Sequence, residues 1–288
     1  MSTKIFILGA GKPHHGEKHS ALDILPSDSQ ALEWTMKALS HLSFETNFVT
    51  GYQASEIQSA YPKLTYHHNI DWETTNSGWS LLASMTTVNH DCLVLYSDAL
   101  HRTHNINQIL DCHADVAIAI DSNWRDRFSD RSLSDLERCE KVCIRDSSLT
   151  SIGSNIEIDD ADAEFAGLAW FSSKSIETLK QIFSEPSSDL NYLRNSSISD
   201  LVDILRKQGS KIKAVDVNGD WAELNESADI VRFVLGTKAQ TLKRLRPMVS
   251  KSRIEDQFSF TVEDWKRNSE LILIKLNKFF GNTKLVVR

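Results

Sequence analysis

Two neighbouring stretches, NIDWETTNSGWSL (69–81) and DCLVLYSD (91–98), decide the fold expected for this chain. The first is polar, aromatic and rich in amides, and it leads into an apolar helix. The second has the pattern of a buried strand that ends on the carboxylate of Asp98. Ligands of open α/β sheets bind outside the carboxyl ends of the strands. The pair therefore predicts a small polar ligand pocket beside a metal-binding acid, an arrangement typical of enzymes that handle nucleotide phosphates.

Outward from this pair, short apolar strands alternate with helices. Strands are expected over 5–8, 44–49, 64–67, 92–96 and 116–120, and helices over 29–42, 55–60, 78–87 and 106–112. Ser29 is a plausible N-cap of the first helix, because its hydroxyl can accept from a first-turn N–H. This alternation predicts a mostly parallel sheet that is covered by helices on both faces.

The middle of the chain adds an antiparallel element. Two apolar stretches, 141–145 and 149–152, flank a polar turn and predict a hairpin. A strand over 163–171, helices over 173–183, 197–208 and 226–235, and a strand over 212–217 follow, with Gly209 at the expected C-cap of the 197–208 helix. Residues 1–235 therefore predict one Rossmann-like, doubly wound α/β domain with a mixed sheet.

From Gly236 onward the character of the sequence changes. A basic helix is expected over 237–246 and one long amphipathic helix over 259–280. The last residues, 282–288, have the pattern of a strand that begins where the sequence stops. We expect 236–288 to be a helical linker and the start of a further domain; the alternative is an edge strand at a natural C-terminus.

Composition limits the classes of function. The 288 residues include 32 Lys and Arg against 39 Asp and Glu, a net charge of −7, which argues against binding a nucleic acid polymer. The four cysteines form no CxxC pair, which favours a reduced, cytoplasmic protein. The apolar stretch near the N-terminus is too short for a signal peptide, and no run approaches the length of a membrane span.

The glycine-rich turn after the first expected strand is a candidate phosphate site. Gly9, Ala10 and Gly11 would present backbone N–H groups to a phosphate, and Lys12 and Lys18 would add positive charge. The turn does not match GxGxxG or a Walker motif. The alternative is a solvated basic loop.

Carboxylates at strand ends are candidate metal ligands. Asp98 offers the hard oxygen that Mg²⁺ prefers, and its alternative role is a helix N-cap. Glu223 and Asn225 follow a further expected strand, share its parity and would point the same way. Asn225 could equally be the N-cap of the helix that begins at 226.

Taken in order, these motifs resemble the sugar-phosphate and choline-phosphate nucleotidyltransferases. The motifs are Gly9-Ala10-Gly11, Val49-Thr50-Gly51-Tyr52, Asn69 to Leu81, Asp98, Glu140-Lys141-Val142, Glu164 to Leu168 and Trp221 to Asp229. The resemblance covers about 4–235 and is nearest to the cytidylyltransferase branch. Two departures stand out: Lys12 or Lys18 must replace the usual arginine of the first loop, and Asn225 stands where the family has an aspartate that binds metal.

The resemblance implies Mg²⁺-dependent transfer of a nucleoside monophosphate, with CMP favoured, from CTP or another NTP to a small phosphorylated acceptor. It implies catalytic roles for Lys12, Lys18 and Asp98; nucleotide contacts from Leu8, Gly9, Ala10, Gly11, Gly51, Tyr52 and Ser97; acceptor contacts from Asn76, Trp79, Ser80, Glu164, Trp221 and Glu223; and Mg²⁺ bound by Asp98 and Asn225. The alternatives are a sugar-1-phosphate acceptor, or a domain that only binds a nucleotide.

The tail resembles the entry to a phosphoenolpyruvate-synthase-like kinase. Stretches 236–242 and 279–288 carry this likeness, and L-glutamine kinases of capsule phosphoramidate synthesis are of this type. The resemblance implies a covalently continuous kinase domain that would make the phosphorylated acceptor.

Overall fold

The computed structural model falls into two units, residues 1–234 and 235–288. Within them the structure describes residues 3–13, 16–85, 90–127, 133–145, 148–185, 189–224, 227–236, 238–246, 249–260, 262–281 and 283–285.

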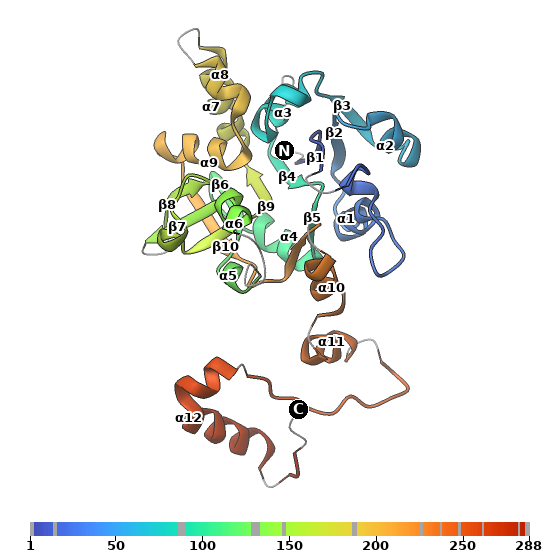
Figure 1. Ribbon diagram of the computed structural model, residues 1–288, viewed down its shortest axis with the longest axis vertical. Coiled ribbons are helices and arrows are strands. Elements are labelled where there is room, and N and C mark those ends of the chain that lie inside the picture. Colours follow the sequence, from blue (N-terminus) through green and yellow to red (C-terminus); the bar gives the residue numbers. More distant parts are fainter. Residues whose placement is uncertain are drawn as a thin grey trace. The chain divides into compact units, whose positions relative to one another are not determined.

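A mixed sheet organises the first unit (Figure 1). Its strands are β1 (Lys4–Gly9), β2 (Glu45–Thr50), β3 (Thr65–His68), β4 (Cys92–Tyr96), β6 (Val116–Asp121), β7 (Lys141–Arg145), β8 (Ser148–Gly153), β9 (Ala163–Phe171) and β10 (Ile212–Asp216). The order across the sheet is β10-β6-β9-β4-β1-β2-β3. β1 pairs in parallel with both β2 and β4, whereas β9 is antiparallel to β4 and β6. This is the doubly wound mixed sheet that the sequence predicts.

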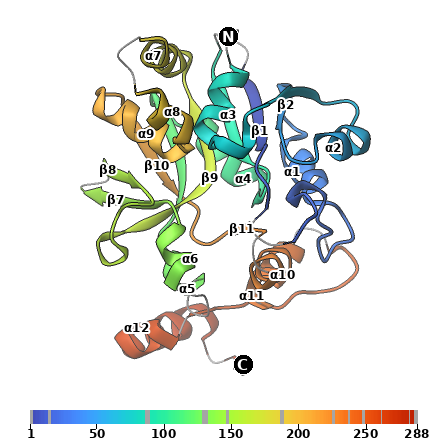
Figure 2. The same ribbon diagram turned by 45° about the horizontal axis from the view of Figure 1, so that its top comes forward.

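The β7–β8 hairpin is the antiparallel extension. β7 pairs with β8 and, through its first two residues, with β9. Figures 1 and 2 show the hairpin on the opposite side of the sheet from β2 and β3. The turn residues Asp146 and Ser147 lie outside the described residues.

Alternate side chains of the central strands feed two separate cores. Phe6 and Leu8 of β1 pack in one core with residues of α3 (Ser77–Ser84), α7 (Ser173–Ser184) and α9 (Ile198–Lys207). Ile5 and Ile7 pack on the other face with residues of α1 (Ala31–Leu39), α2 (Ala54–Ala60) and α4 (Thr103–Leu110). Helices thus cover both faces, because successive strand residues point to opposite sides.

Short elements complete the unit: α5 (Trp124–Arg127), α6 (Leu133–Arg138), α8 (Leu190–Asn195), α10 (Ser227–Leu235), and the 3₁₀ turns η1 (Ser20–Leu22), η2 (Trp72–Thr74) and η3 (Ile158–Asp160). A two-stranded antiparallel sheet joins β5 (Ala99–His101) to β11 (Trp221–Glu223). The capping of α9 agrees with the sequence: Ser197 and Asp200 form a capping box, and Gly209 after the helix has φ +84°.

Three local features differ from what the sequence predicts. Helix α1 begins at Ala31, and its N-cap is Gln30 rather than Ser29; the Ala31 N–H donates to the carbonyl of Asp23. Asp98 lies in the turn between β4 and β5, so it caps no helix. The stretch from Trp221 to Glu223 follows β10, as expected, but it is itself the short strand β11, which the sequence did not predict.

The described elements of the second unit are helices, and residues 249–260 between them have no regular structure. The unit contains α11 (Lys238–Leu245) and α12 (Val262–Phe280), and non-helical dihedrals at Asn268 (φ −158°, ψ 68°) interrupt the single helix that the sequence predicts. Residues 283–285 form no strand; the rest of the expected final strand lies outside the described residues. Within the described parts of the chain, no helix combines the length and apolarity needed to cross a membrane.

Candidate functional site

A cavity of about 600 Å³ opens at the carboxyl ends of β1 and β4. Its lining comes from the glycine turn, the β4–β5 turn, the start of α3, β9, β11 and the region before α9. Polar side chains from parts of the chain more than a hundred residues apart therefore meet at one place. This is the edge of an open α/β sheet where ligands generally bind.

Strand register brings the glycine turn and Asp98 together. Leu8 of β1 pairs with Tyr96 of β4, and the N–H of Ser97 donates to the carbonyl of Leu8 at 2.9 Å. The two strands therefore end at the same edge of the sheet, next to each other. Residues Leu8, Gly9, Ala10, Gly11, Lys12, Ser97 and Asp98 all line the cavity.

The glycine turn is held from behind by the segment after β2. The N–H of Tyr52 donates to the carbonyl of Ala10 at 2.9 Å, and a Cβ on Gly51 would lie 2.5 Å from that same oxygen. Gly51 and Tyr52 are outside the set of cavity-lining residues. They support the turn from outside the cavity, a placement that differs from the direct nucleotide contact expected of them.

His19 also braces the turn, and sequence reasoning did not single it out. It is buried and lines the cavity, with Nε2 2.7 Å from the carbonyl oxygen of Gly9 and Nδ1 accepting from the N–H of Ala21 at 3.1 Å. Burial lowers the pKa of its imidazole. There was little reason in the sequence alone to choose His19, because the same loop also contains histidines at positions 14 and 15.

The two lysines have different positions. Lys12 lines the cavity, and its Nζ lies 5.8 Å from the ring centroid of Tyr52. Lys18 is exposed and is not among the residues that line the cavity. Lys12 is therefore the better placed of the two for a phosphate. His14 and His15 lie outside the described residues.

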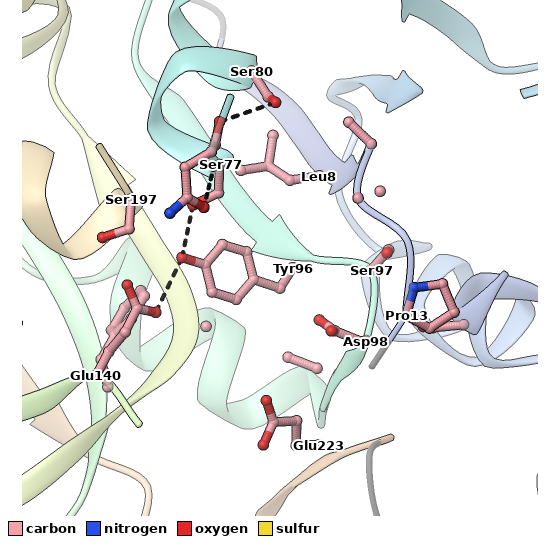
Figure 3. Close-up of a pocket in the computed structure, with 18 of the residues that line it drawn as sticks. Leu8, Pro13, Ser77, Ser80, Tyr96, Ser97, Asp98, Glu140, Ser197 and Glu223 are labelled. Carbon is pink, nitrogen blue, oxygen red and sulfur yellow. Dashed lines mark hydrogen bonds between the residues drawn. The ribbon is translucent and has the colours of Figure 1, made fainter. Parts of the chain in front are cut away.

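Two carboxylates face the cavity from adjacent elements. Glu223 pairs with Ala99 in the small sheet, and the N–H of Leu224 donates to the Asp98 carbonyl at 2.8 Å. Figure 3 shows the Asp98 and Glu223 carboxylates pointing toward the same space. Asn225 lies outside the described residues. Among the residues that are described, no group of three or more His, Cys, Asp or Glu side chains could hold a metal ion by itself.

Trp221 and Glu164 form the buried floor near these acids. The indole Nε1 of Trp221 donates to the carboxylate of Asp121 at 2.9 Å, and its ring stacks on His101. Glu164 pairs with Asp121 across β6 and β9 and is only 3% exposed. Both Trp221 and Glu164 line the cavity.

A hydrogen-bonded network forms a second wall. The hydroxyl of Tyr96 lies 3.1 Å from Ser77 Oγ and donates to Glu140 Oε2 at 3.1 Å, while Ser199 Oγ donates to Glu140 Oε1 at 2.6 Å. Burial raises the pKa of Glu140, and hydrogen bonds from Ser199, Ser197 and Tyr96 oppose that rise. Burial also raises the pKa of Tyr96. Glu140 belongs to one of the motifs that carry the family resemblance, but the sequence predicted no catalytic or binding role for it.

The amide-rich stretch of the sequence forms a third wall. Asn69 donates from Nδ2 to both Thr75 Oγ1 and Ser80 Oγ, each at 2.9 Å. Asn76 caps α3 through its side-chain oxygen and lines the cavity with Ser80. Trp79 does not line the cavity; its ring contacts Phe183.

Distant relatives and similar folds are found among known proteins. No protein-family model matches the chain. Among curated proteins, the CTP:phosphoglutamine cytidylyltransferase of Campylobacter jejuni subsp. jejuni serotype O:2 is 21% identical over 145 residues. That alignment covers 49% of this chain and 57% of the relative, so it spans little more than half of the relative's length.

Solved structures match over most of the chain. The inositol-1-phosphate CTP transferase from T. maritima superposes with a TM-score of 0.60 at 16% identity, covering 86% of this chain and 97% of its own. A putative glucose-1-phosphate thymidylyltransferase from Bacillus anthracis gives 0.59 at 14% identity, covering 88% and 98%. The CTP:phosphocholine cytidylyltransferase from Streptococcus pneumoniae gives 0.57 at 13% identity, covering 80% and 96%. The chain has the Rossmann-like nucleotidyltransferase fold.

Proposed function

We propose that this protein is a nucleotidyltransferase that transfers CMP from CTP to a small phosphorylated acceptor and releases pyrophosphate. The observation that carries the proposal is the common cavity bordered by the glycine turn after β1 and by Asp98 after β4. The fold and the distant cytidylyltransferase relative support the same activity.

The reaction requires positioning and charge neutralisation. An oxygen of the acceptor phosphate attacks the α-phosphorus of CTP, the bond from that phosphorus to the α–β bridging oxygen breaks, and pyrophosphate leaves with the bonding electrons. Oriented groups can supply much of the rate enhancement in such a displacement. The braced turn at Gly9–Gly11 would hold the triphosphate, and Lys12 would neutralise part of its charge.

The acids fit a magnesium–triphosphate. Asp98 and Glu223 offer hard oxygen atoms from two elements, and Mg²⁺ commonly uses one or two protein carboxylates while keeping water and phosphate oxygens as its other ligands. When bound, Mg²⁺ would supply positive charge to the phosphates of the transition state. Asn225 remains a predicted ligand. Lys12 is not a metal ligand in this proposal, and its ammonium group would contact only the phosphates.

The hydrogen bonds of two hydroxyl groups, those of Thr75 and Ser80, support CTP over UTP as the substrate. Thr75 Oγ1 donates to the carbonyl of Asp71 at 2.9 Å and Ser80 Oγ donates to the carbonyl of Asn76 at 3.2 Å, while both accept from Asn69. With their single hydrogens engaged, both hydroxyls present only lone pairs to the cavity. A cytosine placed at this wall offers its 4-amino group as a donor, whereas uracil offers a carbonyl oxygen, to which neither of these two hydroxyls can donate.

A pyrophosphate-release assay tests the activity. Purified protein with Mg²⁺ and each NTP would be given phosphocholine, sugar 1-phosphates, phosphonates and phosphoamides in turn. We expect release with CTP and one acceptor class. Thermal stabilisation by CTP–Mg²⁺ without pyrophosphate release from any acceptor would overturn transfer and leave a nucleotide-binding domain. Preference for sugar 1-phosphates would assign the alternative acceptor class.

Two expectations from the resemblance stay predictions. One is a cytoplasmic location. The other is a kinase-like domain continuous with residues 236–288, which would supply a phosphorylated acceptor to this site.

A further inference from the structure

Glu140 places a carboxylate in the cavity wall. Its two carboxylate oxygens accept hydrogen bonds from the hydroxyls of Tyr96 and Ser199, at 3.1 and 2.6 Å. These donors are neutral, so they orient the carboxylate without cancelling its charge. The proposed chemistry of phosphate transfer does not use this group.

The cations nearest in sequence are directed elsewhere. Lys141 is buried, and its ammonium donates to the backbone carbonyls of Leu136, Glu137 and Cys139 at 3.3, 2.9 and 3.2 Å. Arg138 lines the cavity but forms its ion pair with Asp135. Across the described part of the chain, no ion pair includes Glu140. A carboxylate partly shielded from bulk water is costly unless a positive charge compensates it, and the described residues place no cation in an ion pair with Glu140.

The position of Glu140 suits one end of a small acceptor. Tyr96 precedes Asp98 by two residues, and Figure 3 shows the Tyr96 ring between Asp98 and Glu140. Both acids line the same cavity. A molecule whose phosphate lies near Asp98 and Lys12 therefore extends along Tyr96 toward the Glu140 carboxylate.

We propose that the acceptor carries a protonated amine, and that Glu140 binds this ammonium group while Tyr96 and Ser199 hold the carboxylate in place. This inference rests on the proposed function and narrows its acceptor class to phosphorylated amines. An ammonium–carboxylate hydrogen bond is charge-assisted and stronger than a neutral one. Burial raises the pKa of Glu140, and the opposing causes are hydrogen bonds from Ser199, Ser197 and Tyr96, which are not cations.

Matched acceptors test the charge directly. Aminoalkyl phosphates of two to five carbons, beginning with phosphoethanolamine, would be compared with the hydroxyalkyl phosphates of equal length. Each pair differs by one cationic group. With CTP and Mg²⁺, we expect the amine of at least one pair to have a kcat/KM about tenfold or more above its hydroxyl partner.

The variant Glu140→Gln removes the charge and nearly preserves the shape. We expect it to abolish the amine preference, chiefly by raising KM for the amine acceptor. Glu177→Gln makes the same change at an exposed position on α7 and should behave as wild type. Equal use of both acceptors by the wild type, or an unchanged preference in Glu140→Gln, would overturn the inference.

Calorimetry separates this inference from the proposed function. The same pairs would be titrated into the protein in the presence of CTP and Mg²⁺. Pyrophosphate release with other phosphorylated acceptors but no amine preference refutes the role of Glu140 alone. Amine binding that depends on Glu140, with no pyrophosphate released, supports the amine site and refutes transfer. Binding of neither member of any pair refutes the amine site.

Discussion

His19 and Gly9 are joined by a 2.7 Å hydrogen bond from the imidazole Nε2 to the carbonyl of the glycine turn. The opposite nitrogen, Nδ1, faces the N–H of Ala21, which can only donate. The ring proton therefore resides on Nε2. The neutral ring donates to the glycine turn through Nε2 and accepts from η1 (Ser20–Leu22) through Nδ1, so it links the two elements. The lowered pKa of this buried imidazole keeps it in that form.

Replacing His19 by Gln should loosen the turn. A glutamine amide cannot reproduce both bonds of the rigid ring, so we expect KM for CTP to rise about fivefold or more with a smaller change in kcat. Steady-state kinetics at saturating acceptor would measure both. A His41→Gln change, at an exposed ring outside the cavity, is the matched control. An unchanged KM in the His19 variant would remove its positioning role.

Gly11 and Gly51 should respond differently to alanine. A Cβ on Gly11 meets nothing within 4 Å among the described atoms, and the fold should tolerate it to within about 0.5 kcal/mol. We expect KM for CTP to rise about tenfold, because the methyl would occupy space that the triphosphate approaches. On Gly51, the methyl would lie 2.5 Å from the Ala10 carbonyl and 2.6 Å from Trp72, so unfolding free energy should fall by about 1–3 kcal/mol.

Thermal melts and CTP kinetics on both variants check this contrast. The melting temperature should drop only for Gly51→Ala, whereas Gly11→Ala should keep the wild-type value. If Gly11→Ala binds CTP normally, the triphosphate does not approach this turn.

Asp98→Asn should separate folding from catalysis. The change is isosteric and replaces a charged oxygen that faces the cavity, so we expect kcat/KM for pyrophosphate release to fall by at least about 100-fold. Asp111→Asn, at the exposed end of α4, makes the same change away from the cavity and should be neutral. Turnover of the Asp98 variant within tenfold of wild type would exclude this acid from the mechanism.

The position of Asp98 beside the glycine turn followed from the sequence, because parallel strands end at one edge of a sheet. The Tyr96–Glu140 contact did not follow. It joins residues 44 apart and depends on how β7 docks on β9 and β9 on β4, pairings that no local pattern specifies.

Local capping rules failed where tertiary contacts replaced them. Ser29 has a suitable side chain, yet the carbonyl of Asp23 already accepts from Ala31 at the start of α1. The strand at Trp221 was missed for another reason: three residues carry too little alternation to detect, and its partner β5 is equally short.

Ser80→Ala tests how the base is read. The change removes one of the two hydroxyl lone pairs oriented by Asn69, so we expect the ratio of kcat/KM for CTP over UTP to fall about fivefold. Ser84 lies one turn further along α3, and its hydroxyl donates to the carbonyl of Leu81 away from the cavity. Ser84→Ala should therefore keep the wild-type ratio. A ratio equally high in both variants would place the base at another wall.

His101 should make the protein sensitive to acid. Its ring is buried and stacked on Trp221, Nε2 lies 2.8 Å from the carbonyl of Ala166, and within the described structure Nδ1 has no hydrogen-bond partner. A proton on Nδ1 would therefore be buried without an acceptor. Burial lowers the pKa of His101 from 6.5 to about 4.

The sign of the pH effect follows from this shift. Between pH 6.5 and about 4 the unfolded chain binds a proton at His101 that the folded protein does not, so stability is lost as the pH falls through this window. From pH 6.5 down to pH 5 this proton uptake acts over about 1.5 pH units. The free energy of unfolding at pH 5 should therefore be about 2 kcal/mol lower than at pH 8 on account of His101. Urea unfolding at pH 8 and pH 5 should show that the wild type loses more stability than His101→Gln by about this amount. His19 and His67, whose pKa values are also lowered by burial, titrate in both proteins and cancel from the difference. An equal loss in the two proteins would show that His101 is protonated in the folded state at pH 5, and its ring would then need an acceptor beside Nδ1.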